Sequence, residues 1–118
     1  MGRLSTHVLD TVNGRPAAGL TLALDRLSPD GKRERIVETT TNADGRTDQP
    51  LLTGEAVLPG TYELTFALGA YFRSLGTTMP EPAFLDVVPI RFGIADAEGH
   101  YHVPLLASPW SYSTYRGS

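Results

Sequence analysis

The side chains best suited to moving protons near neutral pH are the three histidines, His7, His100 and His102. His7 lies in an alternating stretch, so Ser5 and Leu9 are expected on the same face of a strand. His100 and His102 are two residues apart and would also share a face, unless His100 belongs to the preceding turn. An imidazole can take a proton from water and return it to a leaving group, which makes these residues candidates for acid–base catalysis.

A His-x-His pair with a distant third histidine is also compatible with a zinc site. No acidic ligand is spaced with His100 and His102, and a turn at His100 would separate the two rings. The chain has no cysteine, so neither thiolate ligands nor disulfides are available. We therefore do not favour a metal centre.

The C-terminal stretch, residues 99–118, combines reactive and bulky side chains. It holds two histidines, the single tryptophan and three tyrosines, and it ends at Arg116-Gly117-Ser118. Aromatic side chains favour burial, so we expect a strand-rich, docked terminus that holds Arg116 and Ser118 in place. Arg46 follows a turn at 42–45 and would be an ordinary solvated charge unless the fold brings it to the histidines.

Composition restricts the possible functions. The 118 residues suit one domain, 1–118, and the 41% hydrophobic share is ordinary for a globular chain. The net charge of −3 argues against a nucleic-acid binder, and no apolar run approaches a membrane span. We expect no signal peptide, and the lack of cysteine fits a reducing compartment. The sequence contains no glycine-rich phosphate loop, nucleophile elbow or paired-carboxylate motif.

Short apolar runs punctuated by 12 glycines and 9 prolines predict a mainly β fold, a sandwich of seven to eight strands with one short helix. Leu68, Phe72 and Leu75 share a helical stripe that Gly76 ends, which predicts a helix over 68–75. Pro104 falls inside a predicted strand, where it is tolerated only at an edge or where its missing N–H is not needed. The predicted strands cover residues 4–10, 20–24, 33–41, 61–66, 87–94, 101–107 and 112–115.

Three segments resemble one known family. Residues 4–11, Leu-Ser-Thr-His-Val-Leu-Asp-Thr, followed by Gly-Arg-Pro-Ala at 14–17, resemble the N-terminal signature of the 5-hydroxyisourate hydrolases, the transthyretin-related enzymes of urate breakdown. His-Tyr-His-Val-Pro-Leu-Leu at 100–106, Ser-Pro at 108–109 and Tyr-Ser-Thr-Tyr-Arg-Gly-Ser at 112–118 resemble the C-terminal signature. Gly-Ala-Tyr-Phe at 69–72 matches the short helix of the family. The resemblance covers essentially the whole chain, although residues 25–41 are generic.

The resemblance implies a transthyretin-like β-sandwich assembled as a homotetramer, a dimer of dimers, with active sites in a channel between the dimers. The implied reaction is the hydrolysis of 5-hydroxyisourate to 2-oxo-4-hydroxy-4-carboxy-5-ureidoimidazoline, in the cytoplasm and without a metal or organic cofactor. It also implies the site residues. The catalytic set is His7, Arg46, His102 and Ser118, and the substrate-binding set is His7, Arg46, Tyr115, Arg116 and Gly117.

Three alternatives remain open. The chief one is a transthyretin-like carrier of small aromatic ligands without hydrolase activity. In the hormone carrier the first-strand histidine and the Tyr-Arg-Gly-Ser ending are replaced, whereas His7, Arg46, His102 and that ending all stand here, which favours the enzyme. A zinc-dependent hydrolase and a purely structural sandwich are the other two, since sandwiches host many functions.

Overall fold

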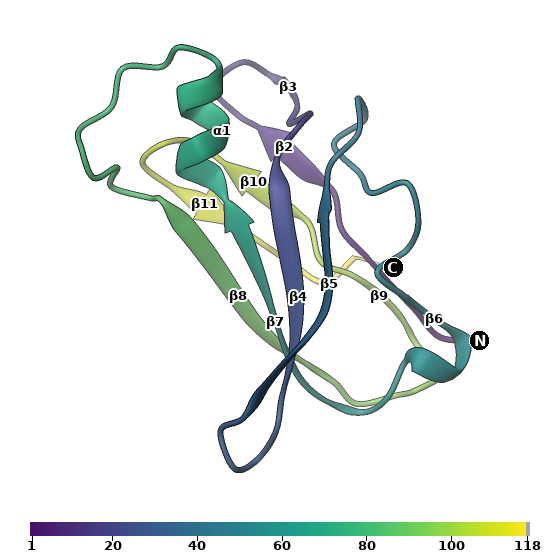
Figure 1. Ribbon diagram of the computed structural model, residues 1–118. Coiled ribbons are helices and arrows are strands. Elements are labelled where there is room, and N and C mark those ends of the chain that lie inside the picture. The colour runs from purple at the N-terminus through teal and green to yellow at the C-terminus, as the bar shows by residue number, and fades with distance from the viewer. Residues whose placement is uncertain (118) are drawn as a thin grey trace.

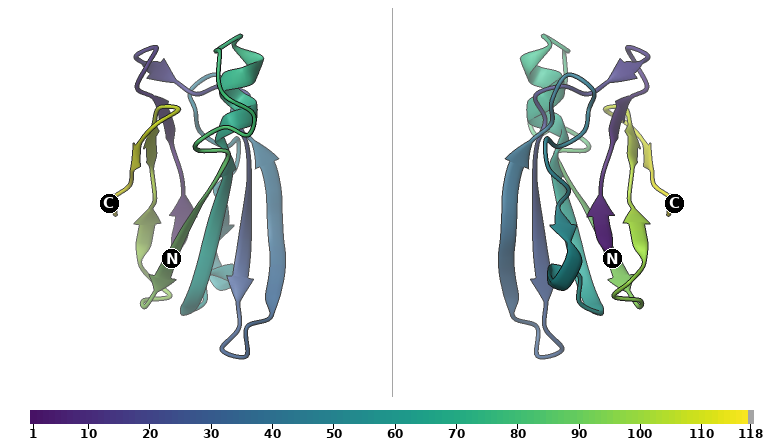
Figure 2. Two further views of the ribbon diagram at one scale, coloured as in Figure 1. Left: turned by 90° about the vertical axis from the view of Figure 1, so that its left-hand side faces the viewer. Right: turned by 90° about the vertical axis from the view of Figure 1, so that its right-hand side faces the viewer.

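The computed structural model describes residues 1–117, in which the strands form two layers that face each other (Figures 1 and 2). The first layer contains β4 (Thr21–Leu27), β5 (Arg33–Thr40), β7 (Gly60–Ala67) and β8 (Val87–Ile94) in the order β5-β4-β7-β8. All three pairings in it are antiparallel. These strands match the sequence alternation: Leu22 and Leu24 of β4 lie opposite Phe66 and Leu64 of β7.

The second layer joins the two ends of the chain. β1 (Arg3–Ser5) lies between β6 (Leu52–Thr53) and β9 (His100–His102). β2 (Val8–Asp10) lies between β3 (Arg15–Pro16) and β10 (Leu105–Ala107), and β11 (Tyr112–Ser113) adds the edge beyond β10. The β1–β9 and β2–β10 pairs are parallel, so the first two strands run beside β9 and β10 from near the C-terminus.

Two of the predicted strands are interrupted. The stretch 4–10 divides into β1 and β2, and 101–107 divides into β9 and β10 around Pro104. The backbone still bonds across the break, because Val103 N donates to Ser5 O and Leu105 N donates to His7 O. Pro104 therefore sits where no N–H is needed toward the first strand, as expected. These breaks and the two-residue strands β3, β6 and β11 bring the described residues to eleven strands, more than the seven to eight predicted.

The predicted helix is present as α1 (Leu68–Ser74), one residue shorter than expected. Gly76, at a φ of +80°, ends it, with its N–H bonded to Arg73 O and that of Thr77 bonded to Phe72 O. Leu75 caps the helix and is exposed, so it does not belong to the apolar stripe predicted for it.

A buried carboxylate ties α1 to the second layer. The Tyr71 hydroxyl donates to Asp10 Oδ2 at 2.8 Å, and Asp10 also accepts bonds from Val12 N, Asn13 N and Asn13 Nδ2. Burial alone would raise the pKa of Asp10, but these hydrogen bonds outweigh it and hold the pKa below its ordinary value. Burial and this contact raise the pKa of Tyr71 to about 12.

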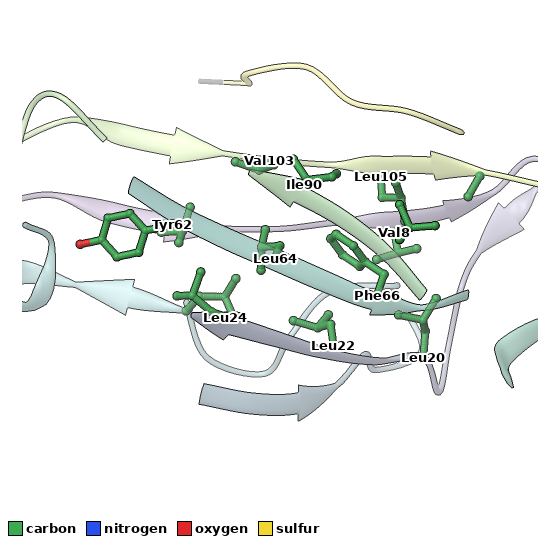
Figure 3. Close-up of a cluster of buried hydrophobic side chains, with 14 of the residues drawn as sticks. Val8, Leu20, Leu22, Leu24, Tyr62, Leu64, Phe66, Ile90, Val103 and Leu105 are labelled. Atoms are coloured by element: carbon green, nitrogen blue, oxygen red, sulfur yellow. The ribbon is translucent and has the colours of Figure 1, made fainter. Parts of the chain in front are cut away.

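The core lies between the layers, where inward-facing residues of both sheets interdigitate (Figure 3). Burying apolar side chains in this way supplies most of the folding free energy. Residues 47–59 contain β6 and a 3₁₀ helix at Gly54–Ala56. No helix among the described residues is long and apolar enough to cross a membrane. The centre of the core is made by Val8, Leu20, Leu22, Leu24, Tyr62, Leu64, Phe66, Ile90, Val103 and Leu105.

Candidate active site

The outward face of the second layer is polar at its centre. Leu4, Thr6 and Val8 are buried, so the alternation of the first strand turns Ser5 and His7 outward. On the neighbouring strand β9, Tyr101 is buried, which turns His100 and His102 outward. The parallel register places Ser5 directly opposite His102. The fold thus brings residues almost a whole chain apart onto one sheet face.

His102 is half-buried and fixed by its neighbours. The Ser5 hydroxyl lies 2.9 Å from His102 Nδ1. Burial lowers the pKa of His102 below its ordinary value, and positive charge on Arg46, His7 and Arg3 lowers it further. The ring is therefore mostly neutral at pH 7, the form that accepts or shares a proton rather than carrying a fixed charge.

The backbone of Arg46 pairs with the first strand and so places the residue at this face. Arg46 forms an isolated antiparallel bridge with His7, and Val8 N donates to Gly45 O at 2.8 Å. Gly45 has a φ of +74°, and a Cβ there would collide with the carbonyl oxygen of Val8, so the close approach requires glycine. His7 Nε2 in turn lies 2.9 Å from Asp44 O. The turn at 42–45 thus delivers a guanidinium beside the first histidine.

Asn42 shapes that turn. Its side-chain Oδ1 accepts hydrogen bonds from Asp44 N at 2.9 Å and Arg46 N at 3.2 Å. Its own N–H donates to Arg46 O at 2.7 Å. An asparagine side chain that accepts hydrogen bonds from nearby backbone N–H groups is typical of a tight turn. Here it fixes the backbone of Asp44 and of Arg46.

The C-terminal tail runs back along the same layer (Figure 2). Gly117 bridges His102, and a Cβ on it would lie 2.8 Å from His102 Cδ2. The Arg116 guanidinium lies 4.0 Å from the ring centroid of Tyr101 and donates to His100 O at 3.2 Å. The tail is therefore docked at Arg116 and Gly117, whereas Ser118 lies outside the described residues.

Three aromatic residues of the C-terminal stretch are not buried within the single chain. Trp110, Tyr112 and Tyr115 are 58%, 43% and 59% exposed. In the same stretch Tyr101 and Leu105 are buried and Leu106 is half-buried. The reason is position: β11 is an edge strand and the segment around it has no third layer to cover it.

His100 does not belong to the preceding turn, because it begins strand β9 and pairs with Arg3. Its Nε2 lies 3.0 Å from Met1 O, at the end of the sheet near the N-terminus. His100 and His102 do share a face, but no group of three or more His, Asp or Glu side chains within residues 1–117 is arranged to hold a metal ion.

Ser5 and Arg3 are the residues of this face that sequence reasoning missed. The alternation had already placed Ser5 on the face of His7, but its real partner is a ring 97 positions away. The same alternation puts Arg3 on that face. Together the face offers two imidazoles, an exposed guanidinium and a hydroxyl, a set that can bind a small anion and transfer protons to and from it.

The fold and this face define a transthyretin-like β-sandwich with a polar, imidazole-bearing sheet face. The chain belongs to the HIUase/Transthyretin family, whose model matches residues 4–117. It is 62% identical to 5-hydroxyisourate hydrolase 2 of Rhizobium meliloti (strain 1021), over 99% of this chain and 97% of that protein. It is 58% identical to the 5-hydroxyisourate hydrolase of Ralstonia nicotianae (strain ATCC BAA-1114 / GMI1000), over the full length of both. The predicted family is confirmed.

Solved structures confirm the predicted fold. A crystal structure of (S)-allantoin synthase superposes with a TM-score of 0.93 and 51% identity, over 99% of this chain. This chain spans only 44% of that protein. Sea bream transthyretin in complex with thyroxine superposes with a TM-score of 0.85 and 32% identity, over 98% of this chain and 94% of that one.

Proposed function

We propose that this chain is a hydrolase that opens 5-hydroxyisourate to 2-oxo-4-hydroxy-4-carboxy-5-ureidoimidazoline, a step in the degradation of urate to allantoin. The observation that carries the proposal is the convergence of His7, Arg46 and His102 on one sheet face. Two relatives more than half identical over nearly their whole lengths bear the name of this hydrolase, which supports the substrate.

The chemistry suits these side chains. The substrate is small, flat, anionic and rich in carbonyl groups, so the planar fork of Arg46 binds it and stabilises the charge that develops on attack. His7 and His102 form an acid–base pair that takes the proton from water and returns it to the leaving nitrogen. Such hydrolysis needs no metal or organic cofactor in this proposal. The tail closes the pocket with Tyr115, Arg116, Gly117 and Ser118, the last of which orients the attacking water.

The whole chain, 1–118, acts as one hydrolase domain in a cytoplasmic homotetramer, a dimer of dimers. His7 and His102 are half-buried and Arg46 is exposed on the open face of the single chain. A facing subunit would turn this open face into a channel and exclude bulk water, which strengthens the charge interactions in the site.

The test is substrate decay followed by ultraviolet absorbance with freshly made 5-hydroxyisourate. The rate without protein is the reference. An excess rate proportional to protein concentration is expected. No excess rate from a folded protein would contradict the proposal and would favour the carrier, for which sea bream transthyretin in complex with thyroxine is a structural precedent. The identity of 32% to that carrier, against 62% to a hydrolase, favours the enzyme.

A further inference from the structure

We infer that both site imidazoles carry their ring proton on Nε2. The Asp44 carbonyl bonds to Nε2 of His7 and leaves its Nδ1 free, whereas the Ser5 hydroxyl bonds to Nδ1 of His102 and leaves its Nε2 free. His7 then presents a bare Nδ1 to the site, and His102 presents an Nε2–H donor. Ser5 becomes a positioning residue, and the two histidines receive different roles. The roles rest on the proposed function, whereas the tautomers do not.

The state of His7 follows from its partner. His7 Nε2 lies 2.9 Å from the backbone oxygen of Asp44. A carbonyl oxygen can only accept a hydrogen bond, so this nitrogen must carry the proton. In the neutral ring the other nitrogen, Nδ1, is then unprotonated. The carbonyl is itself fixed by the turn that Asn42 organises, because Asp44 N bonds to Asn42 Oδ1.

The tautomer of His102 follows from the single proton that the Ser5 hydroxyl can donate. The Ser5 hydroxyl has one proton and lies 2.9 Å from His102 Nδ1. Within residues 1–117 the Ser5 hydroxyl has no other hydrogen-bond partner. If it donates to His102 Nδ1, its proton is in a hydrogen bond; if it accepted a proton from Nδ1 instead, its own proton would have no acceptor. Nδ1 is thus the acceptor and Nε2 carries the ring proton. Burial and the positive charges of Arg46 and Arg3 keep this ring neutral.

The difference orders the reaction. Water attacks the substrate carbonyl carbon, its proton moves to His7 Nδ1, and the carbonyl electron pair moves onto oxygen. His102 Nε2–H and Arg46 donate hydrogen bonds to that oxyanion. As the intermediate collapses, the C–N bond breaks and the proton on His7 Nδ1 passes to the leaving nitrogen. In this scheme His7 alone carries the proton that the proposed function assigns to the pair, and His102 stays neutral as a hydrogen-bond donor, which suits its lowered pKa.

The experiment is a ¹⁵N NMR titration of the histidines in the full-length protein, wild type and Ser5→Ala. In the wild type above the titration range, we expect Nε2 protonated and Nδ1 bare in both His7 and His102. If Ser5 donates to Nδ1, it stabilises the neutral ring, so its removal raises the pKa of His102. If Ser5 accepts from Nδ1–H instead, removal lowers that pKa, and a lowered pKa or a protonated Nδ1 in either ring overturns the inference.

Kinetics provides the second readout. Ser5→Ala should reduce kcat by about tenfold, the scale of one hydrogen bond, with KM little changed. Ser5→Thr keeps the hydroxyl and should restore both kcat and the His102 pKa. Ser113→Ala, which removes an exposed strand hydroxyl of the same layer, is the matched control and should change neither. A Ser5→Ala enzyme with wild-type kcat would contradict the positioning role.

The two proposals fail separately. Wild-type turnover with the wrong tautomers would overturn this inference and leave the hydrolase standing. The expected tautomers in a protein without turnover would overturn the hydrolase and the catalytic roles, and would leave only the positioning of the rings.

Discussion

Gly117 N donates a hydrogen bond to the carbonyl oxygen of His102 across 2.7 Å, so the last described residue lies against a site imidazole. The contact is tight, because a Cβ on Gly117 would lie 2.8 Å from His102 Cδ2 and 3.2 Å from its Cβ. Glycine is therefore required here by close packing against the ring. The tail acts as one wall of the candidate site.

Gly117→Ala should displace the His102 ring and reduce kcat/KM by at least about tenfold, since catalysis depends on sub-ångström placement of such groups. The thermal midpoint should change little, because the tail contributes little to the core. Gly93→Ala is the matched control: Gly93 lies in β8 with no atom closer than 4.0 Å to its added Cβ. Equal activity in the two variants would show that the ring position does not depend on the tail.

Deletion of residues 115–118 removes the Arg116 contacts with Tyr101 and His100 and the Gly117 bridge. It keeps the bond from Thr114 Oγ1 to Pro104 O, so β11 should stay attached. We expect hydrolysis to be abolished while the sandwich and the tetramer persist. Tetramer mass and thermal midpoint should be measured before the assay. Near-normal turnover by a folded, truncated tetramer would mean that the tail is only structural.

His7→Ala, Arg46→Ala and His102→Ala should each reduce turnover by at least about a hundredfold, the usual scale for a positioned acid–base or oxyanion group. His100→Ala is the control from the same sheet face. Its ring bonds to Met1 O at the end of the sheet, so its loss should cost far less. A loss at His100 as large as that at His102 would instead revive the metal hypothesis.

Tyr71→Phe should lower the free energy of unfolding by about 1.5–3 kcal/mol at neutral pH, the value of a hydrogen bond to a charged group. It should also change the alkaline stability. The unfolded chain releases the Tyr71 proton near pH 10, but the folded chain, with its pKa raised to about 12, retains it. Stability from this group is therefore complete below pH 10 and is lost between pH 10 and about 12.

Denaturant unfolding at several pH values checks both effects. The difference between wild type and Tyr71→Phe should shrink as the pH rises through that window. Tyr112→Phe changes an exposed tyrosine of β11 and serves as the control. A pH-independent difference between the wild type and Tyr71→Phe would contradict the assigned pKa shift.

Assembly gives a further prediction. Trp110, Tyr112 and Tyr115 remain exposed in the single chain, and Phe84 lies 6.0 Å from the Trp110 ring and is 68% exposed. Such aromatic exposure is typical of an interface rather than of a monomer surface. Light scattering should give a tetramer. A monomer at micromolar concentration would contradict both the assembly and the shared channel.

Local patterns predicted the first layer well. The alternation of Tyr62, Leu64 and Phe66 identified β7, and Gly76 correctly marked the end of the helix. Both signals are carried by residues within a few positions of each other. Leu75 was predicted to lie on the apolar stripe of the helix but is exposed. Periodicity indicates which residues could face the core, but not whether a partner layer covers them.

The second layer was less predictable, because its contacts join distant residues. The family resemblance implied that His7, Arg46 and His102 lie in one site. The parallel register that places Ser5 opposite His102 could not be predicted from the sequence pattern. In the same register His100 belongs to a strand because it pairs with Arg3. That partner is distant in sequence, so the residues next to His100 do not indicate it. Ser5 was visible as a neighbour of His7, yet its function depends on a bond across 97 positions.

The parallel pairing of the strands near the two ends of this sequence also sets when the site can form during synthesis. β1 and β2 leave the ribosome well before their partners β9 and β10. Until then the first strand has an open edge, and His7 has no His102 beside it. The nascent chain can fold the β5-β4-β7-β8 sheet early, but catalytic competence should appear only after β9 and β10 have left the ribosome.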